Sequence, residues 1–210
     1  MKMKLKQSVL EGAFISSGAR ALRVLCVLSM IFCVLCMALS VMGRQTFDLV
    51  TESGSYEDAI YAEKDHEPAM RGLTVSMSDQ VHVRAGDPQH IQWTIQVGLS
   101  LMYALDIVPF FIACWFLYQV FSNIIQKKIF VEENASCLFY YGVLQCGVSV
   151  LAPFLKIFIS FVVNQVSADS IYVSTGSGLL SGLIPGIAFI IASYIIHYGI
   201  YLLDEVDHTL

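Results

Sequence analysis

Long apolar runs alternate with shorter polar stretches along this chain of 210 residues. Four of the runs carry at most one carboxylate or ammonium group each, and each is long enough to cross a bilayer, because a spanning helix needs about 20 residues. The pattern therefore predicts an all-α membrane protein with a bundle of four transmembrane helices. The expected spans are 24–42, 91–121, 140–166 and 179–203.

Composition points to the same class of protein. More than half of the residues are apolar and the mean hydropathy is strongly positive, which exceeds what the core of one soluble domain of this size would bury. The net charge is slightly negative, and no basic footprint for nucleic acid is present. We therefore expect the lipid bilayer as the main partner and no direct binding of nucleic acid.

Lysine and arginine in the short polar segments predict the orientation. Five of them lie in the N-terminal segment 1–23, and Lys127 and Lys128 lie in the turn 122–139. Because cytoplasmic loops are enriched in these residues, both termini are expected in the cytoplasm, in a bacterial inner membrane. Segment 43–90 and loop 167–178 then face outward, and the tail 204–210 faces inward. The first run is too long for the apolar core of a cleaved signal peptide.

The outer segment between the first two spans contains a local alternation of apolar and polar residues. Period two is the pattern of a strand with one buried face, and it holds within residues 73–78 and again within 81–84. Residues between the two stretches could form a turn, which predicts a β-hairpin over 73–84. Since an isolated hairpin is marginal in water, this one would rest on the helix ends or on another chain. It could be a simple connector or a lid that senses a signal or binds a partner.

Asp106 lies in the middle of the second run and Lys156 lies well inside the third. A charge in hydrocarbon is costly, so each must face protein or water. An ion pair between them would lower the cost, as would a protonated Asp106 bonded to Tyr103. A structural role and a proton or ion pathway both remain open. On the fourth run, His197 could bind a metal or move a proton, although a bond within the bundle or a place at the cytoplasmic interface suits a lone histidine better.

Other residue types argue for packing instead of chemistry. All six cysteines lie in or beside apolar runs, which is typical of small buried hydrophobic residues and not of a disulfide framework. Gly178, Gly182 and Gly186 repeat at a spacing of four and would let another helix approach closely. Neither a phosphate-binding loop, a zinc motif nor a nucleophile motif is found. We therefore expect no enzymatic activity, no cofactor and no bound metal.

Residues 123–134 read NIIQKKIFVEEN, an apolar and basic turn followed by an acidic pair, Glu132 and Glu133, and an asparagine. Together with the acidic ending LDEVDHTL at 203–210, this turn resembles the signature of a bacterial membrane family, the domain-of-unknown-function family numbered 2975. The resemblance covers mainly the chain from about Ile91 onward. Val131 departs from it, since the family usually has Ser or Thr there as a helix cap, so the start of the next helix stays open to within one turn.

The resemblance implies regulation more than catalysis, because such genes often neighbour a small helix-turn-helix transcription regulator. A cytoplasmic partner of this kind could dock on the basic turn and the acidic tail, and a homo-oligomer is compatible with the same surfaces. Besides Lys127 and Lys128, the docking candidates are Glu132, Glu133, Asp204, Glu205 and Asp207. The alternative is a small transporter subunit or an immunity-type membrane protein that uses Asp106, Lys156 and His197.

Overall fold

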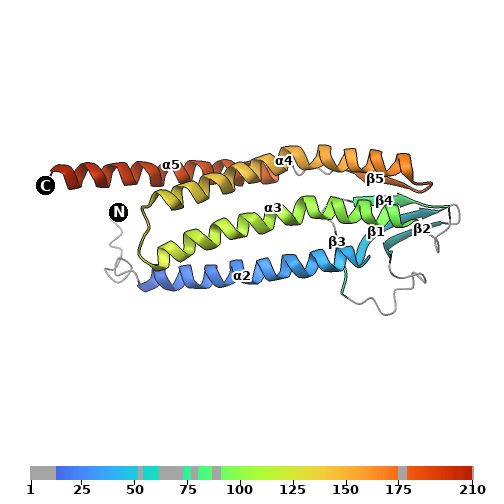
Figure 1. The fold of residues 1–210 in the computed structure, drawn as a ribbon, viewed down its shortest axis with the longest axis horizontal. Coiled ribbons are helices and arrows are strands. Elements are labelled where there is room, and N and C mark those ends of the chain that lie inside the picture. The colour runs from blue at the N-terminus through green and yellow to red at the C-terminus, as the bar shows by residue number, and fades with distance from the viewer. Residues whose placement is uncertain are drawn as a thin grey trace, which may run out of the picture. The chain divides into compact units, whose positions relative to one another are not determined.

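The computed structural model describes residues 13–51, 54–61, 73–76, 80–86, 91–174 and 179–209. Within these residues it contains four long helices and one small sheet (Figure 1). The helices are α2 (Ala13–Val41), α3 (Trp93–Ile125), α4 (Glu132–Val166) and α5 (Leu179–Thr209). The strands are β1 (Gln45–Thr51), β2 (Gly54–Ile60), β3 (Val75–Ser76), β4 (Gln80–Arg84) and β5 (Ser170–Ser174).

All four helices are long and apolar enough to cross a membrane, which confirms the predicted fold class. Large apolar side chains cover their outer surfaces. Phe32 on α2, Phe154 on α4 and Ile195 on α5 each keep more than 60% of their surface exposed. A helix that is apolar all round needs apolar surroundings, and lipid supplies them. The helices extend beyond the predicted runs: α2 begins at Ala13, α4 begins at Glu132, and α5 continues through the acidic tail to Thr209.

The chain divides into two compact units. The sheet unit contains Phe32–Pro109 and Val148–Ser181, and the turn unit contains Met1–Ile31, Phe110–Gly147 and Gly182–Leu210. The sheet unit includes every strand, together with the first part of α3 and the second part of α4. The turn unit includes the connection between α3 and α4.

Strand β1 organises the sheet, whose order is β2-β1-β4-β5 with β3 also on β1. Strand β2 pairs with β1 in antiparallel fashion, with a shift of register between Phe47 and Leu49. The short strand β3 and then β4 pair with β1 in parallel fashion, β3 at Gln45 and Thr46 and β4 from Asp48 to Val50. Because β2 already occupies one edge of β1, β3 and β4 follow each other along the other edge.

The prediction of a hairpin over 73–84 is therefore wrong in its pairing, although strands do form within that range. A period of two tells which side chains share a face but does not select the neighbouring strand. The seven-residue β1 offers one continuous edge to both segments. The expected turn residues 77–79 lie outside the described residues.

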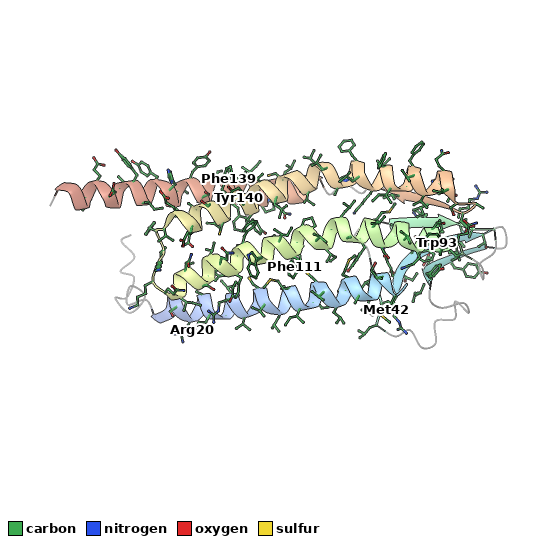
Figure 2. All side chains as sticks on the ribbon, viewed as in Figure 1. Arg20, Met42, Trp93, Phe111, Phe139 and Tyr140 are labelled. Atoms are coloured by element: carbon green, nitrogen blue, oxygen red, sulfur yellow. The ribbon has the colours of Figure 1, made fainter. Side chains whose placement is uncertain are left out.

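Strand β5 comes from the connection between α4 and α5 and pairs with β4 in antiparallel fashion, with His82 opposite Tyr172. Two segments of one sheet lie on the same side of any membrane that the helices cross. The two connections that contribute strands to it therefore share a side. On one face of the sheet, Leu49, Val83 and Ile171 are fully buried against Ile95 and Leu99 at the start of α3. Figure 2 shows Trp93, the first residue of that helix, beside the sheet.

Helices α4 and α5 approach each other closely at glycines within the turn unit. A Cβ atom added to Gly186 would lie 2.5 Å from the Cys146 Sγ, and one added to Gly142 would lie 2.6 Å from the Gly186 carbonyl oxygen. Both glycines thus let the two backbones approach each other. Gly182 is buried on the same helix, one turn before Gly186, whereas Gly178 lies outside the described residues.

Candidate functional site

An ion pair joins α3 and α4 within the sheet unit. The Lys156 Nζ atom on α4 donates a hydrogen bond of 2.9 Å to the Asp106 Oδ2 atom on α3. The Lys156 side chain is only 4% exposed, and the Asp106 side chain is 30% exposed. Since each charge lies within a span, the pairing offsets part of the cost of removing both from water.

Tyr103 lies one helical turn before Asp106 and is buried. It belongs to the same buried cluster as Cys36 on α2, and Cys33 lies one turn before Cys36 on that helix. Both cysteines are almost fully buried. The structure therefore brings together three of the four intramembrane residues singled out in the sequence, and adds a thiol that sequence reasoning treated only as a hydrophobic residue.

A second polar network lies where α2 meets the sheet. Gln96 Nε2 on α3 donates to the Ser40 carbonyl oxygen at 2.5 Å and to the Ser100 Oγ at 3.2 Å. The Ser40 hydroxyl in turn donates to Gln45 Oε1 on β1, at 2.9 Å. These bonds tie β1 to two membrane helices. Polar residues near span ends were not predicted as a network, because their spacing in the sequence shows no common period.

The turn after α3 has a defined shape. Lys127 N donates to the Ile124 carbonyl oxygen and Lys128 N donates to the Asn123 carbonyl oxygen, each at 2.9 Å, which is the pair of bonds of a Schellman motif. Lys127 occupies the left-handed position of this motif, with φ of 63°. Glycine is the usual residue there, because a side chain costs about 1–2 kcal/mol in that conformation. The basic residue is thus kept at a local energetic cost.

Asn134 holds this turn from the other side. Its Nδ2 atom donates to the carbonyl oxygens of Lys128 and Ile129, and its Oδ1 atom accepts from Asn123 Nδ2, all at 2.9 Å. The Asn134 residue is 1% exposed. Helix α4 already begins at Glu132, so Asn134 does not cap it, and the acidic pair occupies its first turn. The helix therefore starts at Glu132 although the Ser or Thr cap of the family is replaced by Val131.

The turn presents charged and apolar side chains around this fixed backbone. Lys127, Lys128 and Ile129 are exposed, as are Glu132 and Glu133 at the start of α4. The ring of Phe130 lies over Gly199 of α5, where an added Cβ would approach it to 2.8 Å.

The remaining predicted residues lie on α5. His197 and Tyr194 line a groove between α4 and α5 within the turn unit. Asp204 and Glu205 are exposed near the end of α5. Asp207 lies in the same helix, and its side chain is outside the described part of the chain. Among the described residues, no three His, Cys, Asp or Glu side chains are grouped as a metal site would require.

The fold and these sites define a multi-pass membrane protein with a small sheet joined to its spans. The chain belongs to a family of proteins of unknown function, DUF2975, which matches residues 54–210. The match confirms the resemblance and begins at the start of β2, further toward the N-terminus than the turn and tail motifs indicated. No curated protein and no solved structure matches the chain.

Proposed function

We propose that this chain is a non-enzymatic membrane protein that binds a cytoplasmic partner at the turn between α3 and α4. The observation that carries the proposal is the conformation of Lys127. A non-glycine residue in the left-handed region persists where the surrounding structure holds it, and such residues cluster at functional positions. In this turn the residue held in the left-handed conformation is a lysine, and its charged side chain is exposed.

The fixed shape of the turn supports the same proposal. Asn134 bonds to two carbonyl groups of the turn and to Asn123, so the backbone is ordered before any partner arrives. A preorganised loop loses less conformational entropy on binding. Exposed Lys127, Lys128 and Ile129 then offer two charges and one apolar contact to a protein surface.

The proposed orientation places this turn and the tail in the cytoplasm and the sheet outside, in a bacterial inner membrane. The excess of lysine and arginine in the N-terminal segment and the turn favours it. The partner we propose is a small helix-turn-helix transcription regulator, as the family resemblance implies. Acidic residues of the tail, Asp204, Glu205 and Asp207, would pair with basic residues of such a regulator. The membrane protein would then sequester or release it in response to a signal.

Lys127→Gly tests the docking role separately from folding. Glycine removes the charge but suits the left-handed conformation, so the thermal stability of the variant should match or exceed that of the parent. Recovery of the cytoplasmic partner in pull-downs from solubilised membranes should fall. The matched control is Lys6→Gly, which removes one charge from the N-terminal segment 1–23. Equal recovery with Lys127→Gly and with the parent would overturn the docking proposal.

Deleting the chain from Asp204 tests the tail in the same assay. Reduced recovery of the partner supports a contribution of the tail to docking. Unchanged recovery would restrict the docking surface to the turn.

The alternative, a small transporter subunit or an immunity-type protein, would draw on the buried ion pair of the sheet unit. Asp106 and Lys156 contact each other directly. This favours a role in joining α3 to α4. A variant of Asp106 separates the two roles, as set out in the Discussion.

A further inference from the structure

A groove of about 310 Å³ lies between the first two turns of α4 and the middle of α5, within the turn unit. Its α4 residues repeat at helical spacing and so share one face of that helix. The residues that give it chemical character are Glu132, Ser136, Phe139, Tyr140, Tyr194 and His197. Phe139 and Tyr140 are labelled on α4 in Figure 2. Ser193 Oγ donates to the Ala135 carbonyl oxygen at 2.6 Å, which joins the two helices at this groove.

Aromatic rings form walls of the groove at steep angles to one another. The rings of Phe139 and Tyr194 have centroids 6.5 Å apart and planes inclined by 83°. Those of Phe139 and Tyr140 are 6.0 Å apart and inclined by 69°. Rings set at such angles can surround a compact cation, which is attracted to their electron-rich faces.

Charge in the groove favours the same kind of ligand. Among the described residues that line it, Glu132 is the one carboxylate, and neither Lys nor Arg lines it. A carboxylate beside aromatic rings suits an ammonium group. The His197 imidazole and the Ser136 and Tyr194 hydroxyls supply donors for an oxygen-rich group attached to that cation.

The groove is lined by the first residues of α4, next to the charged turn. If the span of α5 starts at Leu179 and covers about 20 residues, it ends near Tyr198, one residue beyond His197. On α4, Glu132 is the first residue of the candidate span and follows the charged turn directly. Exposed apolar side chains, including Val143 on α4 and Ile187 and Ile191 on α5, continue from the groove along both helices. An acyl chain could lie along them.

We propose that the groove binds a phospholipid with a primary ammonium headgroup, such as phosphatidylethanolamine. Its ammonium group contacts Glu132 and the aromatic rings, its phosphate accepts hydrogen bonds from His197 and Ser136, and its acyl chains follow the apolar faces of α4 and α5. This site shares Glu132 with the docking candidates, but the proposed lipid binding does not depend on the proposed partner.

The test is native mass spectrometry of the purified full chain, titrated with phosphatidylethanolamine and with phosphatidylglycerol of the same acyl chains. The parent should bind the ammonium lipid at least tenfold more tightly than the glycerol lipid. Glu132→Gln should abolish this preference, whereas Glu133→Gln, which changes the adjacent acid outside the groove, should preserve it. Equal affinity of the parent for both lipids, or equal effects of the two variants, would overturn the proposal.

A second pair of variants covers the case in which Glu132→Gln does not fold. Tyr194→Leu removes an aromatic wall and should weaken binding of phosphatidylethanolamine about tenfold, while Tyr198→Leu, on the same helix outside the groove, should not. Equal effects of these two variants would overturn the proposal. Soluble phosphoethanolamine serves as a further probe. If it binds as tightly as the lipid, the ligand is a small soluble phosphorylated amine and the lipid assignment fails.

Discussion

The Lys156 Nζ atom and the Asp106 Oδ2 atom lie 2.9 Å apart, although 50 residues separate them in the sequence. Lys156 lies one turn after Pro153 on α4, and Asp106 lies one turn before Pro109 on α3. The pair joins two spans within the sheet unit. Without it, each span would carry an unpaired charge among apolar residues. The first prediction concerns the strength of this link.

Asp106→Asn should lower the stability of the protein without altering its insertion. The substitution removes the carboxylate from the Lys156 ammonium group, and breaking a buried pair on one side costs about 3–5 kcal/mol. We expect the free energy of unfolding in detergent to fall by about 3 kcal/mol, measured by denaturant titration.

Replacing both residues, Asp106→Leu together with Lys156→Leu, is the matched control for that experiment. It should regain most of the lost stability, because no charge is left inside the spans. If Asp106→Asn instead unfolds like the parent but abolishes a transport activity in vesicles, the structural role is wrong and the transport alternative is favoured.

Gly186→Ala should weaken the contact between α4 and α5. The added Cβ atom would lie 2.5 Å from the Cys146 Sγ and 3.0 Å from the Gly142 carbonyl oxygen, so the helices must separate or shift. Overpacking of this kind costs about 1–3 kcal/mol. Thermal unfolding in detergent measures the change.

Gly147→Ala provides the comparison for Gly186→Ala, since nothing lies within 4 Å of a Cβ atom at that position. Alanine favours the helix by up to about 1 kcal/mol over glycine, so this variant should be as stable as the parent or slightly more so. A similar loss of stability in both variants would contradict the close approach of the backbones at Gly186.

Asn134→Ala should loosen the turn that we propose as the docking surface. It removes the side-chain bonds to the Lys128 and Ile129 carbonyl groups and to Asn123, and a buried group left without its bond costs about 1–3 kcal/mol. Limited proteolysis with trypsin should then cut after Lys127 or Lys128 several times faster.

Asn123→Ala removes only one of these bonds and should accelerate cleavage less. If neither variant changes the cleavage rate, the bonds of Asn134 do not maintain the shape of the turn.

Cysteine cross-linking tests whether β4 and β5 are neighbours. With His82→Cys and Tyr172→Cys, the two positions are directly opposite in the antiparallel pair, at a separation that a disulfide can bridge. Oxidation of membranes should link them in high yield, seen as a mobility shift on gels under non-reducing conditions.

The control for this cross-link is His82→Cys with Ser170→Cys, which lies on the same face two residues out of register. Its yield should be low. Efficient linking of the control together with failure of the opposite pair would contradict the register. Failure of both pairs to link would contradict the pairing of β4 with β5 and the placement of both connections on one side.

Some features of the candidate sites were visible in the sequence because they depend on local chemistry. Asp106 stands out as a charge within an apolar run, and the turn with Lys127 and Lys128 stands out as a basic interruption. Cys36 carried no such signal, because a buried thiol among apolar residues resembles any small hydrophobic residue. Its place in one buried cluster with Tyr103 depends on how α2 packs against α3 in the sheet unit.

The strands, too, were only partly predictable from the sequence. Alternation within 73–84 indicated strands, but their partner is β1, whose residues 45–51 lie next to the first span and were not predicted as a strand. Strand β5 lies in the connection 167–178, which the sequence pattern predicted only as an outer loop. It becomes a strand by hydrogen bonding to β4, about 90 residues away in sequence.

The sequence by itself determined that the chain has four helices able to span a membrane, because the length and apolarity of a run are local properties that favour insertion into lipid. Only the tertiary structure decided which charges, thiols and strands meet. Those contacts join residues far apart in the chain, and their energies depend on helix packing and sheet pairing that no local pattern encodes.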